Sequence, residues 1–358
     1  MFIEKIQSTE MLNNIASKYS NAVIEENIVK KYTSTDEEYN ALKHGSGIYI
    51  NHNPVIIGLE GNDVLDYLHR VSTNSVKDLQ EGNIINTLFL NEKGRFIDRT
   101  VLLRLDNKFL IIGQNSLDWL LNWINKYIIT EDIQTYAVSN YVSIMITGPQ
   151  SDSFLTVILG DELKNINGNN YLRSYIDGFD FIIYSNSEKE NIKHYKLLIE
   201  KEKLNPFVEY LLNSKSVFDV HLIGEDAYNL YRIKKGIPDK NETNHYYNPH
   251  EVGLINEISF NKGCYIGQEV IARLDTYDKV QRRMFKFSCP HKITTNDNLK
   301  LFDQNNEEIG DVTSFIYSEK ENKTIGLALV RIKSLNEESK FHVLLENKKV
   351  FIEDLVVV

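Results

Sequence analysis

The stretch Lys262-Gly263-Cys264-Tyr265-Ile266-Gly267-Gln268-Glu269 places one of the two cysteines between glycines, directly ahead of a segment with helical character. Residues 268–274 combine good helix formers with apolar positions on one side, so Gly267 is expected to precede a helix. A thiol near a helix N-terminus, with Lys262 close by, favours the thiolate form. The alternative is that Cys264 is a small apolar residue buried in a core, as free cysteines often are.

The composition around this stretch indicates a folded protein of two or three domains, because 358 residues exceed what one ordinary core holds. Apolar residues make up 42% of the chain and charged residues 25%, as in soluble globular proteins. A net charge of −10 argues against direct binding to nucleic acid or to anionic membranes.

The first residues, the apolar runs and the cysteine count bear on the cellular compartment that the sequence predicts. The segment Met1–Lys5 does not lead into an apolar signal core, and no apolar run is long enough to span a membrane. Two cysteines cannot build a disulfide framework in a chain of this size, which fits a reducing environment. We therefore expect a cytoplasmic protein.

Periodicity predicts helices and strands in alternation over roughly the first 270 residues. Helices are expected at 36–43, at 63–70 after Asn62, after Ser116, at 188–203, 207–213 and 225–235. Strands are expected at 54–59, 84–90, 97–105, 109–112 and 142–147, with a hairpin of 171–175 and 179–184 around Asp177-Gly178. The tryptophans Trp119 and Trp123 are expected to pack.

From about residue 280 the helical period disappears, and short apolar runs alternate with turn signals to the end of the chain. That spacing is typical of a small antiparallel barrel or sandwich. The predicted fold class is therefore α+β.

Common catalytic and metal-binding motifs are missing from the sequence. There is no phosphate-binding loop, no His-Glu-x-x-His, no Gly-x-Ser-x-Gly and no Cys-x-x-Cys. Cys289 and His291 offer two soft ligands, which do not make a zinc site, so no metal is predicted.

The octapeptide around Cys264 resembles the signature of the folate-binding YgfZ family, which includes an iron–sulfur assembly factor and proteins described as tRNA-modifying. This family is related to the glycine-cleavage T protein, an aminomethyltransferase. Further segments resemble the superfamily pattern in the expected order: 41–49, 73–82, 90–98, 177–180, 232–238 and the last 70-odd residues.

The resemblance implies a three-domain ring with a folate site at its centre. Two interleaved α+β units would occupy residues 1–279, one formed by roughly 1–50 with 140–279 and the other by 51–139. Residues 280–358 would form a C-terminal antiparallel β-barrel.

The resemblance also assigns a catalytic role to Asp98, which aligns with the essential aspartate of the transferase. There it would stabilise developing positive charge on tetrahydrofolate or steer a proton. The transferase has a second acid at the next position, where this chain has Arg99. Arg99 would hold Asp98 ionised if the two side chains met, whereas strand alternation would turn Arg99 to the opposite face.

Three further residues are implied to bind the folate. Asp180 stands where the family has a pterin-reading glutamate, although it is one methylene shorter, and it could alternatively be a hairpin-turn carboxylate. Arg232 suits the carboxylates of the folate tail but could be a charge on a helix surface. Tyr175 could pack its ring on the pterin or belong to the core.

Three functions follow from these residues. The first is a YgfZ-like monomer that binds tetrahydrofolate and supports assembly or repair of iron–sulfur enzymes through Cys264, in contact with client or assembly proteins. The second is a tetrahydrofolate-dependent aminomethyltransferase, or another C1 transferase, with Asp98 as its central charge. The third is a noncatalytic interaction protein with a vestigial pocket.

Overall fold

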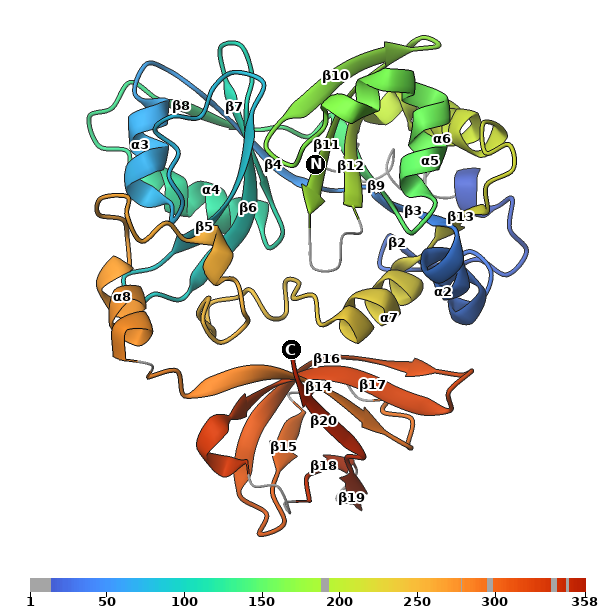
Figure 1. The fold of residues 1–358 in the computed structure, drawn as a ribbon, viewed down its shortest axis with the longest axis vertical. Helices are drawn as coiled ribbons and strands as arrows, with labels where there is room; N and C mark the ends of the chain where they lie inside the picture. Colours follow the sequence, from blue (N-terminus) through green and yellow to red (C-terminus); the bar gives the residue numbers. More distant parts are fainter. Residues whose placement is uncertain (1–13, 188–192, 278, 295–298, 336–339, 346–347) are drawn as a thin grey trace.

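Three lobes, each built on one large β-sheet, are arranged around a central region in the computed structural model (Figure 1). The structure describes residues 14–187, 193–277, 279–294, 299–335, 340–345 and 348–358. The segment between residues 236 and 262 runs between the two upper lobes and the lower one (Figure 1). No helix among these described residues is long and apolar enough to cross a membrane.

The first lobe holds a six-stranded sheet with the order β10-β11-β12-β9-β3-β13. Its strands are β3 Ser46–Asn51, β9 Tyr141–Thr147, β10 Tyr171–Ile176, β11 Phe179–Ser187, β12 Lys193–Glu200 and β13 Val220–Ile223. Its helices are α2 Thr35–His44, α5 Ser151–Leu159, α6 Leu204–Asn213 and α7 Glu225–Lys235, and a small hairpin joins β1 Val23–Glu25 to β2 Ile28–Lys31.

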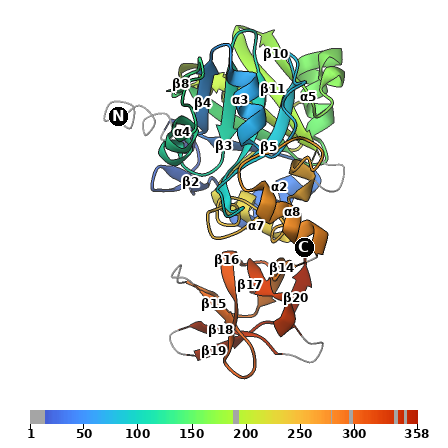
Figure 2. The same ribbon diagram turned by 90° about the vertical axis from the view of Figure 1, so that its left-hand side faces the viewer.

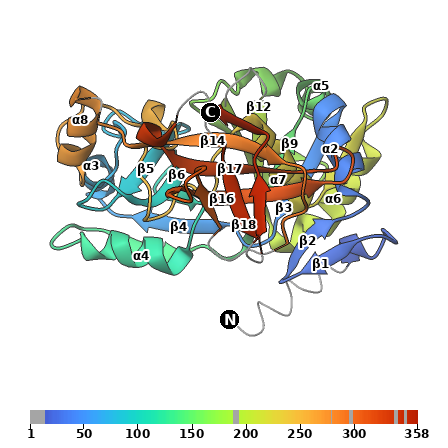
Figure 3. The same ribbon diagram turned by 90° about the horizontal axis from the view of Figure 1, so that it is seen from below.

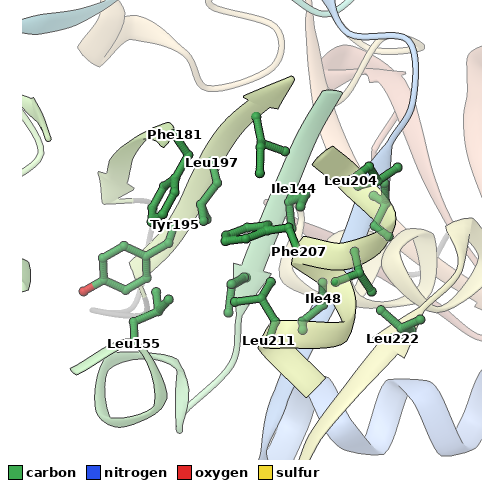
Figure 4. Packing of buried hydrophobic residues seen from close by; sticks show 14 of the residues in the cluster. Ile48, Ile144, Leu155, Phe181, Tyr195, Leu197, Leu204, Phe207, Leu211 and Leu222 are labelled. Atoms are coloured by element: carbon green, nitrogen blue, oxygen red, sulfur yellow. The ribbon is translucent and has the colours of Figure 1, made fainter. Parts of the chain in front are cut away.

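One face of this sheet forms the largest apolar core. Ile48, Ile144 and Leu197 point from three neighbouring strands toward Phe207 and Leu211 of α6 (Figure 4). Because side chains alternate across a strand, the residues between them face the other way. The second face of the sheet is therefore turned toward the second lobe.

The second lobe holds a five-stranded sheet with the order β5-β6-β7-β4-β8. Its elements are β4 Val55–Glu60, α3 Val64–Val71, β5 Ile84–Leu90, β6 Phe96–Arg104, β7 Phe109–Gly113, α4 Leu117–Lys126 and β8 Gln134–Ala137. All of them lie in sequence between β3 and β9, which are neighbours in the first sheet. The second lobe is therefore inserted into the first.

The two sheets meet through a shared apolar cluster. Ile56 and Leu103 of the five-stranded sheet pack with Ile182, Tyr184 and Leu198 of the six-stranded sheet, and all five are buried. We call this group the inter-sheet cluster. Burial of large apolar side chains is the main favourable term in such an interface, so the cluster fixes how the two lobes sit together.

The third lobe is a curled antiparallel half-barrel of seven strands with the order β19-β18-β15-β16-β17-β14-β20. The strands are β14 Arg282–Cys289, β15 Lys300–Phe302, β16 Glu308–Ser318, β17 Lys323–Arg331, β18 His342–Leu345, β19 Lys348–Phe351 and β20 Asp354–Val357. Helix α8 Gln268–Tyr277 leads into it. The half-barrel lies below α7 and α8 (Figure 2) and beneath the junction of the other lobes (Figure 3).

The α+β fold predicted from the sequence is confirmed, but one predicted helix is wrong. Lys193–Glu200 is strand β12, and residues 188–192 lie outside the described residues. Lysine, glutamate and leucine favour helix, yet Tyr195, Leu197 and Ile199 alternate into the core. Pairing with β9 and β11 on both sides overrides the local propensity.

Two smaller expectations also differ from the structure. Trp123 is buried as predicted, whereas Trp119 is 53% exposed on the outer side of α4. The predicted cap Asn62 lies one residue too early, because α3 begins after Asp63.

Candidate functional site

Cys264 is an exposed free thiol on the segment that precedes α8. The helix predicted after Gly267 is confirmed, since α8 begins at Gln268. Cys264 lies four residues before that start. Its thiol is therefore outside the first helical turn, where the helix dipole acts most strongly. This position does not support the expected influence of the dipole on the thiol.

Gly267 holds the cysteine segment against the turn between β5 and β6. Its φ is +83°, and an added Cβ would lie 2.5 Å from the carbonyl oxygen of Asn91. Gly94 of the same turn faces Ile271 of α8, where an added Cβ would lie 3.2 Å from the Ile271 Cδ1 atom. The second glycine of the motif is thus required by close backbone approach.

Lys262 anchors the other end of the cysteine segment. Its side chain is buried, and Nζ donates to the carbonyl oxygens of Ser72 (2.5 Å), Asn74 (3.0 Å) and His69, at the C-terminal end of α3. Burial lowers the pKa of Lys262 to about 8. The ammonium thus binds the negative end of a helix, which makes Lys262 a structural anchor for the thiol segment.

Asp98 is fully enclosed in the second lobe. It pairs across β5 and β6 with Phe89, and so lies on the sheet face that packs against α3 and α4. Its carboxylate accepts hydrogen bonds from the backbone N–H groups of Gln114 (3.0 Å) and Asn115 (3.2 Å). Burial raises the pKa of Asp98 to about 7, outweighing these bonds.

Arg99 takes the opposite face of β6, as strand alternation requires. Its guanidinium forms a two-pronged ion pair with Glu257, with Nε–Oε1 at 2.9 Å and Nη2–Oε1 at 2.6 Å. The side chain of Arg99 therefore points away from the carboxylate of Asp98. Its charge does not offset the rise that burial causes in the pKa of Asp98.

Arg232 is buried where α7 meets the half-barrel. Its guanidinium donates to Glu242 (3.1 Å), to the hydroxyl of Ser314 on β16 (2.7 Å) and to Asn229 (2.7 Å). Asp239 lies 3.7 Å from its Nε atom. These partners already occupy the guanidinium, so the structure places Arg232 as a link between lobes.

Tyr175 and Asp180 lie opposite each other on the β10–β11 hairpin. Tyr175 is 74% exposed, and Asp180 forms a two-pronged ion pair with Arg173 on the surface. That guanidinium lowers the pKa of Asp180.

The hairpin is separated from the other predicted site residues. Ile182 and Tyr184, both in the inter-sheet cluster, follow Asp180 on the same face, and four residues of strand span about 13 Å. Asp98 and Arg232, in contrast, both lie near Asp239. Asp98 and Arg232 thus share Asp239 as a charged neighbour, whereas Asp180 is paired with Arg173 on the surface hairpin.

A row of centre-facing residues was missed by sequence reasoning. Tyr184, Lys196, Met145 and Tyr49 are cross-strand partners on β11, β12, β9 and β3, and we call them the central row. Their sequence neighbours Tyr195, Ile146 and Ile48 belong to the core on the opposite face. The period-two pattern of residues 194–199 was the signal that could have revealed Lys196.

The central row runs from the inter-sheet cluster to α7. Tyr184 packs in that cluster, and the ring of Tyr49 stacks on Tyr228 of α7 with centroids 4.8 Å apart and an interplanar angle of 18°. On the next row, buried His194 bonds through Nδ1 to the hydroxyl of Thr147 at 2.8 Å. Tyrosine rings beside a lysine suit a flat ligand that carries negative charge.

Among the described residues, no group of three or more histidine, cysteine or acidic side chains is placed to hold a metal ion. Cys289 is buried, and its thiol contacts the carbonyl oxygen of His291 at 3.6 Å.

The inserted second lobe and the curled half-barrel define the glycine-cleavage T-protein fold. The structure matches the crystal structure of glycine cleavage system aminomethyltransferase T from Bartonella henselae with a TM-score of 0.79 and 17% sequence identity. The match covers 97% of this chain and 95% of that one.

The chain belongs to the GCVT N-terminal domain family, whose model matches residues 13–262. It is 24% identical over 314 residues to a putative chloroplastic transferase of Arabidopsis thaliana, covering 86% of this chain and 71% of that protein. It is also 24% identical over 307 residues to the aminomethyltransferase of Thermotoga maritima, covering 84% and 82%. The family match ends at Lys262, so Cys264 lies beyond it.

Proposed function

We propose that this protein binds a reduced folate between its lobes and supports iron–sulfur enzymes through Cys264, without transferring an aminomethyl group. The observation that carries the proposal is the exposed thiol on a segment fixed at both ends, by Lys262 and by Gly267. Thiolates are the ligands of iron–sulfur clusters, so such a thiol could supply one ligand to a cluster on a partner protein, or attack the outer sulfur of a partner's persulfide and release the partner's thiolate.

The surroundings of Asp98, the carboxylate that aminomethyl transfer would use, also favour a protein that does not transfer an aminomethyl group. Asp98 is enclosed and bonded to backbone N–H groups. Arg99 stands where the transferase pattern has its second acid, and its charge is neutralised by Glu257. The position next to Asp98 therefore supplies no second carboxylate that could stabilise positive charge developing on the transferred group.

Folate binding is supported by family membership and by the chemistry of the central row. Tyr49, at the α7 end of the row, would contact the flat pteridine, and Lys196 would pair with a carboxylate of the glutamate tail. Tetrahydrofolate would supply one-carbon chemistry when bound.

Two variants test the proposal together. Cys264→Ser should bind tetrahydrofolate in calorimetry with unchanged affinity and fail to restore iron–sulfur enzyme activity in cells that lack the protein. Lys196→Met should weaken tetrahydrofolate binding at least tenfold. Full restoration of activity by Cys264→Ser, or unchanged binding by Lys196→Met, would contradict the corresponding half of the proposal.

Aminomethyl transfer remains the second candidate, because the pKa of Asp98 is raised to about 7. A group that titrates near neutral pH is suited to general acid–base catalysis. Turnover of an aminomethyl donor with tetrahydrofolate that disappears in Asp98→Asn would favour this candidate. Equal turnover, or none, in both proteins would remove it.

A further inference from the structure

A cavity of about 240 Å³ lies at the joint between α8 and the half-barrel, away from the central row. Its walls come from the 250–255 segment, the end of α8, β14 and the end of β20. Most drug-sized ligands occupy cavities of roughly 300–1,000 Å³, so this one suits a smaller molecule.

His250 is the unusual group in this cavity. Its side chain is 94% buried (6% exposed), and among the described residues neither ring nitrogen has a hydrogen-bond partner. The nearest group is Oδ1 of Asp275, 3.5 Å from Nε2, which is too far for a good hydrogen bond. Burial lowers the pKa of His250 despite Asp275, so the ring is neutral at pH 7.

A neutral imidazole has one N–H donor and one acceptor nitrogen. With Nε2–H turned toward Asp275, Nδ1 is left as an acceptor that needs a donor from a ligand. A buried polar atom without a partner is costly, which makes His250 a feature that a ligand would satisfy.

Charged groups of both signs border the cavity. The carboxylate of Asp275 is about half exposed, and Arg283 is an exposed residue on β14. Glu251 also lines the cavity, but its carboxylate is occupied by Arg95 and Arg282, both at 2.9 Å. The charges left for a ligand are therefore one cation and one anion.

The remaining walls are apolar. They are formed by Val252, Gly253, Ile255, Leu274, Val280, Met284, Val357 and the side chain of Val358.

We propose that this cavity binds a small zwitterion of the amino-acid class with an apolar side chain. Its carboxylate pairs with Arg283, its ammonium group donates to Nδ1 of His250, whose Nε2–H is turned toward Asp275, and its side chain packs on the valine and leucine walls. The ammonium supplies the donor that Nδ1 lacks. The proposal is independent of folate binding and of Cys264.

L-Leucine is the probe for the test, with two half-ligands as controls: 4-methylpentanoate, which lacks the amine, and 3-methylbutylamine, which lacks the carboxylate. In titrations of the full chain followed by NMR, L-leucine should shift the ring signals of His250. Each half-ligand should bind at least tenfold more weakly.

Two matched variants separate specific binding from general charge effects. Arg283→Gln should weaken leucine binding at least tenfold, whereas Arg273→Gln, an equal charge change at an exposed position of α8 outside the cavity lining, should leave it unchanged. Both positions are exposed, so both variants should fold. The proposal fails if millimolar L-leucine leaves the His250 signals in place, or if the two variants bind alike.

Discussion

Arg99 and Glu257 form a two-pronged ion pair that joins the second lobe to the segment preceding the cysteine motif. The distances are 2.9 Å from Nε and 2.6 Å from Nη2 to the same carboxylate oxygen, and about a tenth of each side chain is exposed. Glu257 belongs to a short 3-10 helix, Ile255–Glu257, whose last carbonyl oxygen also accepts a hydrogen bond from Thr73. The pair therefore holds the segment that leads to Cys264 against β6.

Removing one partner of this pair should strongly destabilise the protein. Arg99→Leu leaves the carboxylate of Glu257 largely buried without a partner, which should lower the free energy of unfolding by about 3 kcal/mol. Urea unfolding measures the change. The control is Arg173→Leu, which removes an equally two-pronged but exposed pair with Asp180 and should cost under about 1 kcal/mol. Equal losses of unfolding free energy in the two variants would show that burial does not determine how strongly the Arg99–Glu257 pair stabilises the protein.

The two glycines of the cysteine motif should differ in their tolerance of alanine. Gly267 has a φ of +83° and lies against the Asn91 carbonyl, whereas an added Cβ at Gly263 meets nothing within 4 Å. Gly267→Ala should lower the free energy of unfolding by about 2 kcal/mol or more, since strain and a backbone clash add.

Gly263→Ala, the matched control, should change stability by less than about 0.5 kcal/mol. Alkylation of Cys264 by iodoacetamide, followed by mass spectrometry, provides a second measurement. Its rate should change in Gly267→Ala, because the segment moves, and stay constant in Gly263→Ala. A larger loss of stability and a larger change in alkylation rate in Gly263→Ala than in Gly267→Ala would show that Gly267 does not position the thiol segment.

Asp98 should make stability fall as pH rises from about 4 to 7. Its pKa is raised to about 7 in the folded protein from the usual 3.8, so in this window the folded state keeps a proton that the unfolded state releases. The difference in unfolding free energy between the native protein and Asp98→Asn should therefore decrease across that range. Urea unfolding at a series of pH values checks this, and a constant difference would mean that the carboxylate is ionised throughout.

Elements with strong local signals could be predicted from the sequence. Helix α7 has the predicted bounds, Glu225–Lys235, because Gly236 ends it in the left-handed conformation. The hydroxyl of Ser116 caps α4 as expected by accepting a bond from Trp119 N–H, and Asp177-Gly178 turns the β10–β11 hairpin with positive φ at both residues. In each case a few adjacent residues determine the conformation.

The arrangement of the centre could not be predicted in the same way. The central row depends on the register of four strands that lie as far apart in sequence as Tyr49 and Lys196. The partners of Arg232 depend on how the half-barrel docks, since Ser314 is 82 residues away. Residue type suggested which side chains could bind a folate, but only tertiary packing determines which of them are already paired.

Lys262 should make stability rise with pH between about 8 and 10.5. Its pKa is lowered to about 8 in the folded protein, so above pH 8 the folded state loses a proton that the unfolded state keeps. The unfolding free energy of the native protein, relative to Lys262→Met, should increase in this window by up to about 1.4 kcal/mol per pH unit. A difference that does not change with pH would mean that the carbonyl oxygens of Ser72 and Asn74 fully compensate the burial of the ammonium. Lys262 would then be a permanently charged anchor of the thiol segment.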